Sequence, residues 1–156
     1  MSRVAIDTSG RRCRRCPRGT NVVIAAVQAS HPHHAPARGA LEKLLSAGDT
    51  LVFPAHVLLE AYSVLTRLPG DLRIEPELAR SLIRDFAAMG EVVVLDARSH
   101  IEVVERAAAN GIRGGMIYDG VIAATAAKHA DVLLTFNRRD MRRFGAAIEI
   151  RAPGIG

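Results

Sequence analysis

Four acidic residues of this chain have the type and placement that could hold a divalent metal ion. Asp7 directly follows an apolar run, Val-Ala-Ile, and Asp119 opens an Ala-rich segment just after a Gly-Gly pair. Glu60 lies at the edge of an apolar helical stripe, and Asp140 follows the apolar run Val132–Thr135. Carboxylates brought together repel one another unless a cation lies between them, and Mg²⁺ prefers oxygen ligands. Such a site activates water and stabilises charge on a scissile phosphodiester.

Each acid taken alone also has an ordinary structural explanation. Asp7, followed by Thr and Ser, is typical of an Asx turn or a helix cap, and Asp119 is typical of a first helical turn. The stem of Glu60 could carry its carboxylate to solvent from a boundary position. Asp140 could belong to a capping-box-like arrangement in which Asn137 caps a short helix. Three of the four follow a strand or open a helix at the ligand-binding end of the sheet, and this shared placement favours a common site.

The elements that must position these acids follow an alternating pattern. Short apolar runs separated by helical patterns predict an α/β fold in three layers, with a mainly parallel central sheet of about five strands covered by helices on both faces. Open sheets of this kind bind ligands beyond the carboxyl ends of their strands. Strands are expected at Val4–Ile6, Leu51–Phe53, Val92–Leu95, Val132–Thr135 and Ala147–Ile150, and helices at Val22–Gln28, Ala37–Ala47, Ala55–Leu68, Pro76–Met89, Ser99–Asn110 and Tyr118–His129.

The overall composition predicts one folded domain over residues 1–156, with 49% hydrophobic residues to fill its core. The formal net charge of +5 permits a polyanionic partner such as nucleic acid without requiring one. We expect no secretory signal, because charged residues stand where an apolar run should be, and no membrane span. Two cysteines make no disulfide framework, so the cytoplasm is the expected location.

The acids and their surroundings closely resemble the PIN-domain ribonucleases, specifically the VapC-type toxins of bacterial toxin–antitoxin pairs. The segments that carry this resemblance cover nearly the whole chain: VAIDTS, FPAHVLLEAYSVLTRLP, GIRGGMIYDGVIAATAAKHADVLLTFNRRDMRRF and IEI. The resemblance implies a parallel sheet between helical layers, cleavage of RNA that depends on Mg²⁺ or Mn²⁺, a homodimer, and inhibition by a cognate antitoxin.

The same resemblance assigns roles to residues of this chain. Matched motif by motif, the catalytic and metal-binding acids fall on Asp7, Glu60, Asp119 and Asp140, and the supporting polar residues on Thr8 and Asn137. The resulting hypothesis is an endoribonuclease in which Asp7, Asp119 and Asp140 hold metal ions. Glu60 completes the cluster and orients or deprotonates the attacking water, leaving a 5′-phosphate and a 3′-hydroxyl.

The segment at about 10–21, GRRCRRCPRGTN, departs from the family pattern, in which the first acid leads directly into a helix. One interpretation is a basic insertion after Asp7. The other aligns Gly19-Thr20-Asn21 with the family triplet, which would put glycine where the acid belongs. We prefer the insertion, because Val-Ala-Ile supplies the strand before Asp7. The departure leaves a second function open: a catalytically impaired PIN-like domain that binds RNA or antitoxin without cleaving, because its first metal ligand is disturbed.

Two further clusters contain residue types that could bind a ligand. Cys13 and Cys16, with the histidines at 31, 33 and 34, could in principle form a zinc knuckle, but their spacing suits one poorly. Four arginines flank Asp140 and are either a solvated helical face or contacts to RNA phosphates, and we favour the second: Arg138, Arg139, Arg142 and Arg143. Contacts of that kind give affinity and salt dependence rather than sequence choice.

Overall fold

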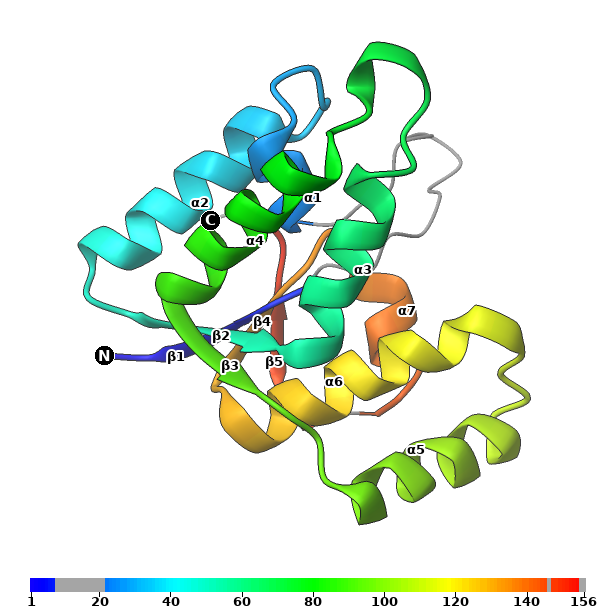
Figure 1. Cartoon of the computed structure of the whole chain (residues 1–156). Coiled ribbons are helices and arrows are strands. Elements are labelled where there is room, and N and C mark those ends of the chain that lie inside the picture. The colour runs from blue at the N-terminus through cyan, green and yellow to red at the C-terminus, as the bar shows by residue number, and fades with distance from the viewer. Residues whose placement is uncertain (8–21, 146, 155–156) are drawn as a thin grey trace.

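The computed structural model describes residues 1–7, 22–145 and 147–154 of the chain (Figure 1). Thr8 and the predicted insertion at 10–21, with Cys13 and Cys16, lie outside the described residues. On either side of that segment the chain comes back together, since the backbone N–H of Val22 donates to the carbonyl of Asp7 at 3.1 Å. This is the arrangement that the insertion hypothesis requires.

A five-stranded sheet runs through the middle of the molecule in the order β3-β2-β1-β4-β5, and every neighbouring pair is parallel. In the central strand, Ala5 pairs with Val52 on one side and with Leu133 on the other. The strands are β1 (Arg3–Ile6), β2 (Thr50–Pro54), β3 (Gly90–Val93), β4 (Val132–Leu134) and β5 (Glu149–Arg151). The predicted parallel sheet of about five strands is therefore confirmed.

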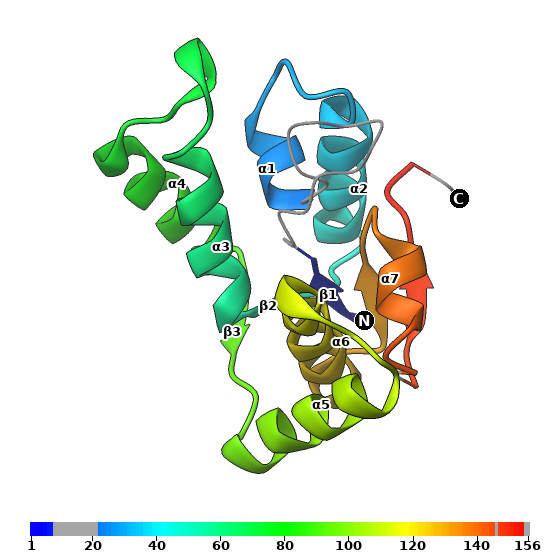
Figure 2. The same cartoon turned by 90° about the vertical axis from the view of Figure 1, so that its right-hand side faces the viewer.

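Helices cover both faces of this sheet, as Figures 1 and 2 show. Because side chains alternate along a strand, Val4 and Ile6 pack into one core with α1 and α2, while Ala5 packs into the other with α6. The predicted three-layer α/β/α arrangement is confirmed. The helices are α1 (Val22–Val27), α2 (His34–Ser46), α3 (Ala55–Leu65), α4 (Pro76–Ala88), α5 (Ala97–Ala109), α6 (Ile117–His129) and α7 (Arg138–Arg142), with short 3₁₀ turns η1 (Gly70–Leu72) and η2 (Gly114–Met116).

The third strand differs from its prediction in both position and burial. It begins at Gly90, not at Val92, because Gly90, which follows the end of α4, already pairs with Leu51 of β2. A Cβ atom at Gly90 would lie 2.3 Å from the carbonyl oxygen of Leu51, so only glycine fits this close approach. The strand forms an edge of the sheet, and its Glu91 and Val92 are exposed. The expectation of apolar strands covered on both faces is thus wrong for β3.

The other edge strand is also shifted. β5 starts at Glu149 instead of Ala147, and Glu149 and Arg151 are exposed side chains that pair with each other at 2.7 Å. Helix boundaries agree with the predictions to within three residues at each end, the largest shifts being the earlier start of α2 and the earlier end of α3. Among the described residues, no helix is long and apolar enough to cross a bilayer.

Candidate active site

The first candidate acid, Asp7, lies at the carboxyl end of the central strand and is fully buried. Its backbone N–H donates to the carbonyl of Leu134 at 3.0 Å, which continues the β1–β4 pairing. Its carboxylate accepts a hydrogen bond from the hydroxyl of Thr135, which is also fully buried. A buried carboxylate needs hydrogen bonds or a cation to remain ionised, and Thr135 supplies one such bond.

The alternation of side chains places this pair on the side of the sheet that α6 covers. Ala5 and Leu133 contribute to the core on that side, so the residues two positions further, Asp7 and Thr135, point the same way. Thr135 is a functional candidate that the sequence reasoning missed. The predicted strand, Val132–Thr135, included it as a strand residue, whereas β4 ends at Leu134 and Thr135 follows it, as Asp7 follows the neighbouring β1.

The second and third acids, Glu60 and Asp119, line one pocket of about 270 Å³. β2 runs directly into α3, which carries Glu60 in its second turn, and Asp119 lies in the first turn of α6. Only 1% of Asp119 is exposed and both of its carboxylate oxygens are buried, whereas the side chain of Glu60 is 26% exposed. The structure thus brings Glu60 and Asp119 together.

Close packing of α6 fixes where Asp119 lies. The next residue, Gly120, is buried, and a Cβ atom there would lie 2.5 Å from the ring of Phe144 and 3.0 Å from Val103. Ile122, Ala123 and Ala126 then bury the body of the helix. This Ala-rich helix therefore lies close to its neighbours, and that packing holds its first turn in place.

The fourth acid, Asp140, is half-buried on the short helix α7. Asn137 occupies the N-cap position of α7, as predicted, but its side chain makes no capping hydrogen bond. The capping-box-like interpretation is wrong on this point, because the local hydrogen bond goes the other way: the backbone N–H of Asn137 donates to the hydroxyl of Thr135 at 2.8 Å. One hydroxyl therefore links the turn before Asp140 to the carboxylate of Asp7.

The arginines around Asp140 differ in burial. Arg138 is half-buried, and the other three are exposed: Arg139, Arg142 and Arg143. The guanidinium of Arg143 contacts the sulfur of Met116 at 3.3 Å, so α7 reaches the turn that precedes Asp119. The histidines at 31 and 33 lie in the turn before α2, and His34 begins that helix.

The donor set fits a hard divalent cation. Mg²⁺ is commonly held by one or two carboxylates together with substrate phosphates and waters, and Glu60 and Asp119 present two carboxylates to one pocket. Asp7 is buried at the carboxyl end of β1, and neither it nor Asp140 is among the residues that line this pocket. Within the described ranges, no three His, Cys, Asp or Glu side chains are grouped so that they could hold a metal ion by themselves.

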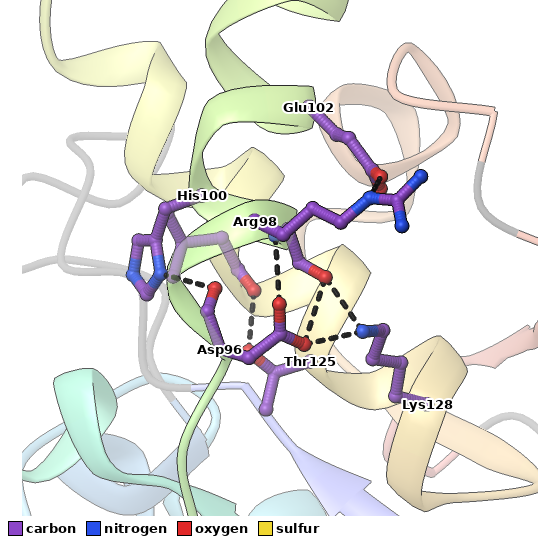
Figure 3. Close-up of polar contacts among 8 residues, drawn as sticks. Asp96, Arg98, His100, Glu102, Thr125 and Lys128 are labelled. Atoms are coloured by element: carbon purple, nitrogen blue, oxygen red, sulfur yellow. Dashed lines mark hydrogen bonds and ion pairs between the residues drawn. The ribbon is translucent and has the colours of Figure 1, made fainter.

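A polar cluster on the other side of α6 couples that helix to α5 (Figure 3). Asp96 caps α5 by accepting from the backbone N–H and the hydroxyl of Ser99, both at 2.9 Å. Lys128 of α6 donates to Asp96 at 2.5 Å and to the hydroxyl of Ser99 at 2.6 Å. These hydrogen bonds hold the pKa of Asp96 well below its usual range, and the bond from Lys128 has the largest effect. Such a carboxylate is a poor base, so we read the cluster as a structural tie and not as a nucleophilic site.

This tie predicts a loss of stability at low pH. A carboxylate whose pKa is lowered by folding stabilises the protein above its unfolded pKa and loses that contribution as pH falls through the folded value. We therefore expect Asp96→Asn to lower the urea midpoint at pH 7, and the difference from wild type to shrink below about pH 4. In a Lys128→Met background the substitution should matter less. An unchanged difference between pH 7 and pH 3 would contradict this assignment.

Comparison with known proteins places the chain in a family. Residues 20–147 match the PIN domain family. Ribonuclease VapC40 from Mycobacterium tuberculosis is 34% identical over 123 residues, which span 79% of this chain and 84% of that protein. Ribonuclease VapC27 from the same species is 42% identical over 85 residues, but these span only 54% of this chain and 60% of that relative.

Solved structures agree at the level of the fold. VapBC2 from Rickettsia felis, bound to a DNA fragment from their promoter, superimposes with a TM-score of 0.63 at 18% identity, covering 97% of this chain and 98% of that chain. FitAcB from Neisseria gonorrhoeae superimposes with a TM-score of 0.64 at 17% identity, covering 96% of this chain and 97% of that chain. The family match begins at residue 20 and so does not include Asp7, whose place rests on the structure alone. With the match covering most of the chain, the resemblance is confirmed: this chain belongs to the PIN domain family, among its VapC-type members.

Proposed function

We propose that this protein is a metal-dependent endoribonuclease that acts as the toxin of a toxin–antitoxin pair. The observation that carries the proposal is the pocket at the carboxyl edge of the parallel sheet that Glu60 and Asp119 share. Parallel α/β sheets bind their ligands at this edge. The names of the two relatives from M. tuberculosis, both ribonucleases, support the same activity.

In this mechanism Asp7, Asp119 and Asp140 would hold Mg²⁺ or Mn²⁺, directly or through water. A bound metal would lower the pKa of water and stabilise negative charge on the phosphodiester. Glu60, which is partly exposed in the pocket, orients the attacking water and accepts its proton. In-line attack on phosphorus then leaves a 5′-phosphate and a 3′-hydroxyl.

The structural neighbours and the charge of the chain support two proposed partners, an antitoxin protein and an RNA substrate. The R. felis structure contains a VapBC2 pair, which supports a cognate antitoxin for this chain as well. The exposed Arg139, Arg142 and Arg143 would contact RNA phosphates beside the acidic pocket. We further propose a homodimer that acts in the cytoplasm, without a membrane partner.

The test is cleavage of single-stranded RNA by the purified full-length chain in Mg²⁺ or Mn²⁺. We expect cleavage that stops in excess EDTA and returns with added Mn²⁺, and products that carry a 5′-phosphate and a 3′-hydroxyl. Equal cleavage in excess EDTA, or products with a 2′,3′-cyclic phosphate, would overturn the mechanism.

The alternative of an impaired domain that binds without cleaving makes a different prediction for the same protein. Calorimetric titration with Mn²⁺, on the wild type and on a variant lacking residues 10–21, separates the two. An intact site binds Mn²⁺ in both proteins. If only the shortened variant binds the metal and cleaves, the segment has disabled the site in the natural chain.

A further inference from the structure

The pocket that holds Glu60 and Asp119 also has features that the metal does not need. Four polar or aromatic positions of α3 and of the turn that follows it are spaced at i, i+4, i+7 and i+11, so they share one face. In chain order they are His56, Glu60, Ser63 and Arg67, and the last three line the pocket. Across from them, the first turn of α6 contributes Tyr118 and Asp119 to the same pocket. A ring, a hydroxyl and a guanidinium therefore accompany the two carboxylates.

The ring of Tyr118 lines the pocket and is held in place. It stacks on the imidazole of His56, with ring centroids 5.0 Å apart and an interplanar angle of 22°. In spite of this contact Tyr118 is 48% exposed. An aromatic ring that is supported on one side and open on the other is a ready surface for a further planar group.

The support from His56 is uncharged at neutral pH. Burial lowers the pKa of His56, and the nearby His100 lowers it further. Its Nε2 lies 3.9 Å from a carboxylate oxygen of Glu60, which for a neutral imidazole is a contact and not a charge pair. His56 thus stacks on Tyr118 as a neutral ring.

The pocket also contains a positive group. Two carboxylates repel an approaching phosphodiester, and the guanidinium of Arg67, which lines the same pocket, counters that repulsion. Arg67 follows the last turn of α3 and is exposed, so a phosphate can reach it from solvent. The aromatic ring matches the base of a nucleotide and the guanidinium matches its phosphate. The two carboxylates match the metal ion that the proposed cleavage requires.

We propose that this pocket receives one unpaired nucleotide of single-stranded RNA, with its base stacked on Tyr118 and an adjacent phosphate against Arg67. The inference rests on the proposed ribonuclease function and names the subsite next to the scissile bond. Stacking on an aromatic ring tolerates any base, so the subsite selects unpaired RNA and not a particular sequence. Double-stranded RNA keeps its bases paired and cannot use it.

The first test replaces the ring. Tyr118→Leu should weaken binding of a short single-stranded RNA, and raise the KM for its cleavage, about tenfold. Tyr118→Phe keeps the ring and should stay within about twofold of wild type. The chain has two tyrosines, both described, and only Tyr118 lines the pocket, so Tyr62→Leu is the matched control and should leave binding unchanged.

The second test observes the stacking directly and does not need cleavage. The chain has no tryptophan, so in the Tyr62→Phe variant all tyrosine emission comes from Tyr118. Titration in EDTA with an RNA oligonucleotide should quench this emission, and an abasic oligonucleotide of the same length should not. Equal quenching by the two oligonucleotides, or Tyr118→Leu binding like wild type, would overturn the subsite.

These outcomes separate the two proposals. Metal-dependent cleavage that Tyr118→Leu leaves unchanged refutes the stacking subsite and keeps the ribonuclease. Base-dependent quenching in a protein that never cleaves RNA keeps the subsite and refutes the ribonuclease. Every measurement uses the whole chain of 156 residues.

Discussion

Asp119→Asn protein is expected to lose RNA cleavage by about a thousandfold while keeping its fold. The neutral amide has nearly the shape of the carboxylate but offers no anionic oxygen to a metal ion. Charge stabilisation by a bound metal contributes several kcal/mol to the transition state, and about 4 kcal/mol corresponds to a thousandfold in rate. Asp119 is 1% exposed, and its carboxylate is one of the two that line this pocket, the other being that of Glu60.

The comparison needs a substitution of the same kind elsewhere. Asp85→Asn, at an exposed position of α4, should cleave RNA at the wild-type rate. Circular dichroism and the urea midpoint of Asp119→Asn should match those of wild type, because the body of α6 is buried through Ile122, Ala123 and Ala126. Calorimetry should show weakened Mn²⁺ binding. Wild-type cleavage by Asp119→Asn, purified in the same way, would remove Asp119 from the mechanism.

Much of the fold could be predicted from the sequence, since strands and helices of this kind carry local patterns. Uninterrupted apolar runs such as Val-Ala-Ile indicate buried central strands, and β1 begins within one residue of its prediction. Edge strands lack that pattern. β3 was misplaced because its position depends on the fit of Gly90 against Leu51, which are distant in sequence and become neighbours only in the sheet.

The site could be predicted in part for the same reason. Asp7 and Asp119 have local signals, one after a strand and one at the start of a helix, and the structure places both where those signals indicate. Glu60 and Asp119 meet in one pocket, which topology alone made plausible. The contacts that support them were not predictable, because they join separate segments: Thr135 with Asp7, and His56 with Tyr118.

Thr135→Val should damage both stability and activity, although Thr135 is none of the predicted site residues. Valine keeps the shape of threonine and removes the hydroxyl that donates to Asp7 and accepts from the backbone N–H of Asn137. All of the Thr135 side chain is buried, so water cannot replace the lost bonds. We expect the free energy of unfolding to fall by about 1–3 kcal/mol, measured by urea denaturation. Groups that orient a metal ligand typically contribute about 10- to 100-fold in metal affinity or activity, and we expect such a loss in kcat/KM.

Thr135→Ser separates the two effects, because serine keeps the hydroxyl and gives up only a methyl group. It should retain Mn²⁺ affinity and cleavage close to wild type, at some cost in stability from the cavity left behind. If Thr135→Val loses stability but binds Mn²⁺ as wild type does, the carboxylate of Asp7 is a structural group and not a metal ligand. Loss of metal affinity in Thr135→Val with its recovery in Thr135→Ser would instead tie Asp7 to the metal through the hydroxyl that joins β1 to β4. The first metal ligand would then precede the basic segment, as the insertion hypothesis requires.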